Sequence, residues 1–173
     1  MGTGVNHLAP GDHVILTPAP PCGQCYYCQR NDHSLCVNAM SILSGLLPDG
    51  SSGLSWQGQQ VYRGCGVGAL AEYVTLPATG AVKIDDDIPL DVACVIGCAL
   101  QTGVGAVLNT AAMEAGATCV VMGLGGIGMA TVQGARIAGA SVIIGSDPVP
   151  ERRQKALDFG ATHVLDPRED DIS

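Results

Sequence analysis

TCVVMGLGGIG, residues 118–128, is a short apolar run that passes directly into a glycine-rich turn. The apolar residues 118–122 predict a buried strand, and residues 129–139 after the turn have a helical composition. A second apolar run, residues 141–144, leads to Asp147. This order predicts a βαβ unit with a G-x-G-x-x-G turn, and therefore an α/β fold built on a parallel sheet.

The glycines of this turn have predicted roles in binding a dinucleotide. Gly123 permits the turn, Gly125 lets a pyrophosphate approach the backbone, and Gly128 lets helix and strand pack closely. Gly126 belongs to the same predicted cofactor-binding turn. The phosphates would lie on backbone amides at the helix N-terminus, where the helix dipole favours negative charge.

The residue after the second strand predicts which dinucleotide binds. Asp147 follows the turn by about 20 residues and would accept hydrogen bonds from the adenosine ribose hydroxyls. Its charge would repel the 2′-phosphate of NADP, so NAD is the predicted cofactor. Arg152 and Arg153 leave an alternative open, because a nearby arginine can accept a 2′-phosphate. Both can equally be surface charges of the next predicted helix, residues 150–159.

Four cysteines follow one another closely in the N-terminal third of the chain: Cys22, Cys25, Cys28 and Cys36. This spacing lets four thiolates converge on one tetrahedral zinc ion. A site closed by four thiolates leaves no open coordination position, so its predicted role is structural. Two disulfides or an iron–sulfur cluster are the alternatives, although ferredoxin-type clusters use a different spacing. His33 could in principle replace Cys36 as the fourth ligand.

The composition limits the class of protein. Of the 173 residues, 47% are hydrophobic and 14% are charged, which excludes a disordered chain. Sixteen acidic residues against eight basic ones give a net charge of −8, which argues against a nucleic-acid partner. Aromatic residues make up only 3%, so the core must be built from Val, Ile, Leu and Ala.

No targeting segment is visible in the sequence. The chain opens MGTGVN, without a basic region followed by an apolar run. Glycines and Gln101 interrupt the most apolar stretch, residues 92–108, which is therefore predicted to be a poor membrane span. The working class is a cytoplasmic protein without a membrane partner, whose eight cysteines favour metal binding over disulfides.

Several further elements are predicted around these motifs. Residues 14–16, 69–76 and 81–84 have the apolar patterns of strands. Pro89 begins a helical segment, and residues 98–113 have the composition of another helix.

The order of the motifs resembles one enzyme family. A four-cysteine lobe (residues 22–36), an Ala71-Glu72-Tyr73 strand, Gly97-Cys98 with Thr102-Gly103, and GLGGIG resemble the zinc-dependent medium-chain alcohol dehydrogenases. The class III, formaldehyde dehydrogenase-like bacterial branch is most similar. The resemblance implies a partial GroES-like β domain over residues 1–97. It also implies the first part of a doubly wound Rossmann sheet over residues 98–173.

The resemblance also implies a reaction and its site residues. The family oxidises alcohols to aldehydes or ketones, with zinc as Lewis acid and nicotinamide as hydride acceptor. Cys98 matches a catalytic-zinc ligand, although alone it would be read as a buried apolar cysteine. Thr102 and Ile127 match positions beside the nicotinamide, and Asp147 and Arg152 match positions at the adenosine ribose. The implied substrate is an alcohol, an aldehyde or a formaldehyde–thiol adduct, and full-length relatives are expected to be homo-oligomers.

Two parts of the family pattern are missing from the sequence. The earlier catalytic-zinc ligands, a Cys and a His in a Gly-His-Glu motif, have no counterpart, and the remaining Rossmann strands would follow Ser173. Because catalytic zinc needs at least three protein ligands, we expect a fragment lacking both ends, with little or no hydride transfer. The alternatives are a polyol dehydrogenase or aldehyde reductase of the same superfamily, and a non-catalytic remnant that binds zinc and nucleotide.

Overall fold

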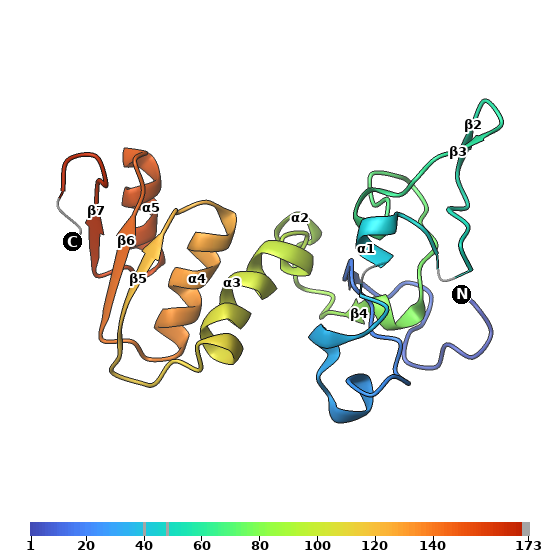
Figure 1. Ribbon diagram of the computed structural model, residues 1–173, viewed down its shortest axis with the longest axis horizontal. Helices are drawn as coiled ribbons and strands as arrows, with labels where there is room; N and C mark the ends of the chain where they lie inside the picture. Colours follow the sequence, from blue (N-terminus) through green and yellow to red (C-terminus); the bar gives the residue numbers. More distant parts are fainter. Residues whose placement is uncertain (40, 48, 171–173) are drawn as a thin grey trace. The chain divides into compact units, whose positions relative to one another are not determined.

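The computed structural model describes residues 1–39, 41–47 and 49–170. The chain divides into two compact units, Met1–Gly97 and Cys98–Ser173 (Figure 1).

One antiparallel strand pair organises the first unit. β1 (Val14–Leu16) pairs with β4 (Ala81–Lys83), and Ile15 lies opposite Val82. The Lys83 ammonium lies 2.5 Å from the Asp12 carboxylate, which joins the turn before β1 to the end of β4. Both strands confirm the sequence prediction for these residues.

Short elements make up the rest of this unit. β2 (Ser55–Trp56) and β3 (Gln59–Gln60) form an exposed two-residue hairpin. The helical turns are α1 (Ser41–Ser44), α2 (Leu90–Ala93), η1 (Cys28–Arg30), η2 (His33–Leu35), η3 (Gly64–Gly66) and η4 (Ala78–Gly80).

Residues 69–76, predicted as a strand, pair with no other strand in the part of the chain that is described. Leu70 and Tyr73 are exposed, and the Thr75 carbonyl accepts a hydrogen bond from the Arg63 guanidinium instead of from a neighbouring strand. The strand prediction is wrong here, because an apolar pattern forms a ladder only where a second backbone supplies its hydrogen bonds.

The second unit contains the predicted βαβ pattern. β5 (Thr118–Met122), β6 (Val142–Ser146) and β7 (His163–Leu165) form a parallel sheet in that order. α4 (Gly126–Ile137) connects β5 to β6, and α5 (Pro150–Phe159) connects β6 to β7 (Figure 1). The α/β prediction from the glycine-rich turn is therefore confirmed.

Aliphatic side chains fill the core of the second unit, as the low aromatic content predicts. Val121 and Ile143 from the sheet pack with Val132 from α4, and each is at least 94% buried. The buried core residues are Val107, Val121, Leu124, Val132, Ala135, Ile143, Ala156 and Ala161.

An apolar helical run, Leu90–Thr110, joins the two units along the chain. Contrary to the prediction from its glycines, it is long and apolar enough to cross a membrane by length and composition alone, with a mean hydropathy of 1.7. Its later part packs on α4, because a Cβ at Gly103 would lie 2.5 Å from the Ile127 carbonyl oxygen. After α2 the run continues through η5 (Ile96–Leu100), α3 (Gln101–Gly105) and η6 (Ala106–Thr110).

Candidate functional site

The four predicted zinc ligands converge in the first unit. The Sγ atoms of Cys22, Cys25, Cys28 and Cys36 all lie within 4.8 Å of one another. Two helical turns reverse the chain between the ligands: Cys28 begins η1, and Cys36 directly follows η2. All eight cysteines of the chain are free, so the two-disulfide alternative is wrong for this structure. His33 does not belong to the cluster.

Backbone amides surround the sulfur atoms of this cluster. The Cys28 amide lies 3.5 Å from the Cys25 sulfur and lowers the pKa of that thiol to about 6. The Cys22 and Asn38 amides donate to the Cys36 sulfur and lower its pKa as well. Burial raises the pKa of Cys28 to about 11. Because zinc binds thiolates, Cys28 must lose its proton on metal binding.

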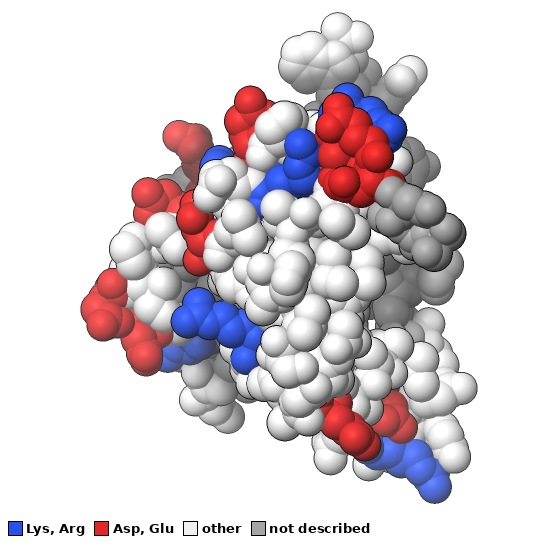
Figure 2. All heavy atoms as spheres, turned by 90° about the vertical axis from the view of Figure 1, so that its left-hand side faces the viewer, with Lys and Arg blue, Asp and Glu red and all other residues white. Residues whose placement is uncertain are grey.

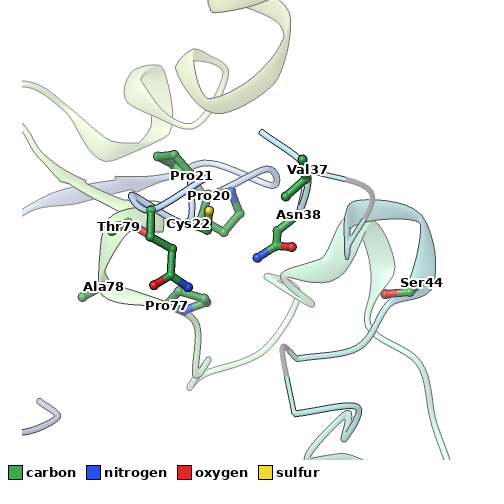
Figure 3. A pocket seen from close by; sticks show the side chains of 10 residues that line it. Pro20, Pro21, Cys22, Val37, Asn38, Ser44, Pro77, Ala78 and Thr79 are labelled. Atoms are coloured by element: carbon green, nitrogen blue, oxygen red, sulfur yellow. The ribbon is translucent and has the colours of Figure 1, made fainter. Parts of the chain in front are cut away.

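A cavity of about 670 Å³ lies beside the cysteine cluster (Figure 3). No charged residue and none of the predicted cofactor-binding residues line it, so it is not the dinucleotide site. Its walls are formed by Pro20, Pro21, Cys22, Gln24, Val37, Asn38, Ser44, Pro77, Ala78 and Thr79.

Cys98 lies in the π-helical turn η5 and is exposed, not buried as a lone apolar cysteine would be. The Thr102 hydroxyl donates to the Cys98 carbonyl oxygen at 2.7 Å, one helical turn away. Within the described ranges, the four-cysteine cluster is the only group of three or more His, Cys, Asp or Glu side chains with ligand atoms this close. Cys98 does not belong to this group.

The glycine-rich turn has a backbone that side chains would strain or block at two positions and leave open at a third. Gly123 has a φ of +86°, and its amide donates to the Ser146 carbonyl oxygen at 2.7 Å. A Cβ at Gly128 would lie 1.9 Å from the Gly123 carbonyl oxygen, so only glycine fits there. A Cβ at Gly125 would meet nothing within 4 Å. The backbone just before α4 is therefore open to a ligand, and Ile127 beside it is half exposed.

Asp147 joins the end of β6 to this turn. Its carboxylate is 98% buried and accepts hydrogen bonds from the Leu124 and Val149 amides, each at 2.8 Å. The Arg152 guanidinium lies 3.4 Å from the same carboxylate. Burial raises the pKa of Asp147, but these two amides and Arg152 outweigh it, so the pKa lies below its usual range. A charged carboxylate thus stands beside the glycine-rich turn.

Arg153 does not share the position of Arg152. Its guanidinium donates to the Asp147 carbonyl oxygen at 2.6 Å and to the Asp166 carboxylate at 2.9 Å. Asp166 and Arg168 were not among the predicted site residues. The sequence feature that could have identified them is their place directly after the short apolar strand β7. The carboxyl ends of parallel strands share one edge of the sheet, so residues after β7 lie near those after β6.

Charged side chains of both signs are mixed on the face of the molecule that Figure 2 shows. Lys and Arg side chains lie among Asp and Glu side chains there and do not gather in one basic patch.

Two family models match the chain. Residues 1–86 match the alcohol dehydrogenase GroES-like domain, and residues 126–173 match the zinc-binding dehydrogenase model.

Individual relatives agree with these models. The chain is 42% identical over 165 residues to alcohol dehydrogenase B of Mycobacterium tuberculosis, covering 95% of this chain and 44% of that protein. It superimposes with a TM-score of 0.92 and 35% identity on an alcohol dehydrogenase zinc-binding domain protein from Burkholderia ambifaria, covering 99% of this chain and 47% of that one. A zinc-binding dehydrogenase from Sinorhizobium meliloti, solved bound to NADP, gives a TM-score of 0.71 and 28% identity over 99% of this chain and 44% of that one.

The chain spans less than half the length of each of these relatives. The family models match residues in both units. The chain belongs to the zinc-containing medium-chain alcohol dehydrogenases, with a partial GroES-like domain followed by part of a Rossmann-like domain.

Proposed function

We propose that this chain carries the structural-zinc lobe and the NAD-binding turn of a cytoplasmic, NAD-dependent zinc alcohol dehydrogenase. The single observation that carries the choice of NAD is the buried, charged Asp147 carboxylate beside the glycine-rich turn. The substrate would be a small alcohol or a formaldehyde–thiol adduct. When bound, NAD accepts the hydride that the alcohol loses.

The described residues have distinct roles in this proposal. The open backbone at Gly125 would receive the pyrophosphate, and the amides at the start of α4 would bind its oxygens. Asp147 would accept hydrogen bonds from the adenosine ribose hydroxyls. The ribose would replace the Arg152 contact, which at 3.4 Å is the longest that the Asp147 carboxylate makes. Thr102 and Ile127 would flank the nicotinamide. Their elements are in contact, since Gly103 packs against the Ile127 backbone.

The two proposed zinc sites differ in how well the residues fit a metal. Four convergent sulfur atoms fit a structural zinc ion, which Cys22, Cys25, Cys28 and Cys36 would hold. Cys98 provides one ligand for a catalytic zinc, whereas such a site needs three protein ligands. The described residues therefore do not fit a catalytic zinc.

Nucleotide titration tests the choice of cofactor. We expect NADH to bind the purified chain at least about tenfold more tightly than NADPH, because a 2′-phosphate would face the Asp147 carboxylate. The Asp147→Asn variant keeps the side-chain shape and removes the charge, so this preference should fall by about tenfold. The fluorescence of each reduced nucleotide, titrated separately, measures its affinity.

Asp158→Asn is the matched control for this experiment, because Asp158 is exposed on α5 and loses the same charge. Its preference for NADH should equal that of the unmodified chain. Equal or tighter binding of NADPH by the unmodified chain would contradict NAD as the cofactor. The relative from Sinorhizobium meliloti that was solved bound to NADP is a precedent for that outcome.

Turnover is the second test. We expect the purified, zinc-loaded chain to form no measurable NADH from ethanol, benzyl alcohol, or formaldehyde with a thiol, because Cys98 lacks partner ligands among the described residues. Absorbance at the NADH band follows the reaction, and a full-length zinc alcohol dehydrogenase serves as positive control. Alcohol-dependent NADH formation by this chain would overturn the expectation.

A further inference from the structure

A buried carboxylate at the end of β7 binds two arginines. Asp166 is 95% buried, and its two carboxylate oxygens accept hydrogen bonds from Nε and Nη2 of Arg168 at 3.0 and 2.7 Å. Arg153 donates to the same carboxylate at 2.9 Å. The Arg168 guanidinium and amide, together with Arg153, hold the pKa of Asp166 well below its usual range. Charge-assisted, bidentate pairs of this kind have a fixed geometry.

Both arginines also reach the loop that follows β6. Arg153 donates to the Asp147 carbonyl oxygen and Arg168 to the Pro148 carbonyl oxygen, each at 2.6 Å. These are the two peptide groups that directly follow the ribose-binding position. Asp166 thus connects the end of β7 to the neighbouring loop after β6 through two guanidinium groups.

The backbone polar groups of residues 147–149 are all engaged. The Asp147 amide donates to the Leu165 carbonyl oxygen at 3.3 Å, and the Val149 amide donates to the Asp147 carboxylate. The Val149 carbonyl oxygen accepts the amides at the start of α5. Arginines donate to the other two carbonyl oxygens, those of Asp147 and Pro148. Any change in the conformation of this loop would therefore break at least one backbone hydrogen bond.

The same contacts determine which cations are available to a ligand. Arg152 and Arg153 contact Asp147 and Arg168 contacts the neighbouring Pro148, but Arg153 and Arg168 are also ion-paired with Asp166. Arg152, whose side chain is 53% exposed, contacts the Asp147 carboxylate and is the one of these three arginines with no ion pair to Asp166, whereas the Arg168 side chain is ion-paired although it is 63% exposed. Replacing Asp166 by a neutral residue would release two guanidinium groups beside the ribose-binding position.

We propose that Asp166, through Arg153 and Arg168, is a specificity-determining positioning residue for the dinucleotide. It holds the loop that presents Asp147 to the adenosine ribose, and it withholds two arginines from a 2′-phosphate. This inference rests on the proposed function, because it assumes that the adenosine end of a dinucleotide binds at Asp147. It adds that preference for NAD depends on a carboxylate that does not touch the cofactor.

The test compares two variants of the full chain, Asp166→Asn and Arg168→Gln, with Asp158→Asn as control. The first readout is the ratio of NADPH to NADH dissociation constants. The second is hydrogen exchange of the Val149 amide measured by NMR without nucleotide, with the core Ile143 amide as internal reference. The second readout does not require nucleotide binding.

Asp166→Asn should lower the ratio by about tenfold, because it releases two cations. Arg168→Gln releases none, so its ratio should stay within about twofold while the Pro148 carbonyl loses its donor. Both variants should speed Val149 exchange at least about tenfold relative to Ile143. A merely structural role would change the two affinities together and leave the ratio unmoved.

Each failure has a separate meaning. An unchanged ratio in Asp166→Asn overturns the specificity role, and unchanged Val149 exchange in both variants overturns the positioning role. If the unmodified chain binds neither nucleotide, the proposed function and the specificity role fail together, and the exchange measurement still decides the positioning role. Should Asp166→Asn not fold, the milder Arg168→Gln variant carries the exchange test.

Discussion

Replacing Cys28 by serine is expected to abolish zinc binding and to unfold the first unit. Among the described residues of this unit, the buried hydrophobic side chains are Cys28, Cys36, Val67 and Ala93. Two of these four are proposed zinc ligands, so the unit has a small apolar core apart from the cluster. Small domains with little core depend on metals or disulfides for stability, and the cysteines here form no disulfide.

Zinc analysis and limited proteolysis measure this effect. The unmodified chain should hold one zinc ion, and Cys28→Ser or treatment with a strong chelator should reduce this to none. Protease sites in residues 1–97 should then become accessible, while the sheet of the second unit stays protected. Cys65→Ser is the matched control, since Cys65 is exposed and lies outside the cluster, and it should keep its zinc.

Two results would contradict this interpretation of the cluster. Full zinc content in Cys28→Ser would show that the four sulfur atoms do not form the site. Two zinc ions in the unmodified chain would show that Cys98 has partner ligands that we do not identify.

Gly128→Ala is expected to destabilise the second unit by about 3 kcal/mol. The added methyl carbon would lie 1.9 Å from the Gly123 carbonyl oxygen. The clash cannot be relieved by a side-chain rotation, because the carbonyl oxygen belongs to the backbone and the methyl carbon is attached directly to it. Helix α4 and the turn would have to separate, which disturbs the packing of Val132 on the sheet. Urea unfolding followed by circular dichroism measures the loss.

Gly125→Ala is the matched comparison, because a Cβ there meets nothing within 4 Å and its φ of −77° suits alanine. Its stability should change by less than about 0.5 kcal/mol. Its NADH affinity should fall at least about tenfold, since the methyl group would occupy the space that the pyrophosphate needs. Unchanged NADH binding would remove Gly125 from the proposed site, and an unchanged stability of Gly128→Ala would contradict the close contact.

Much of the fold could be predicted because its motifs are local. The strand, turn and helix of residues 118–137 follow one another without a break, and each glycine has its role within this segment. The cysteines of residues 22–36 are separated by turns short enough to bring their sulfur atoms together. The strand predicted at residues 69–76 was wrong, because its outcome depended on a pairing partner that an apolar pattern does not reveal.

By itself, the sequence determined the glycine-rich turn, the cysteine cluster and the acidic residue after β6, since close spacing along the chain constrains all three. Only the tertiary structure decided the roles of the arginines. Arg152 and Arg153 are equivalent as neighbours in the sequence, yet one contacts the Asp147 carboxylate and the other binds Asp166. The physical reason is the order of the parallel sheet, in which β6 and β7 are neighbours. Their carboxyl ends therefore lie side by side, although 18 residues of the chain lie between Asp147 and Asp166.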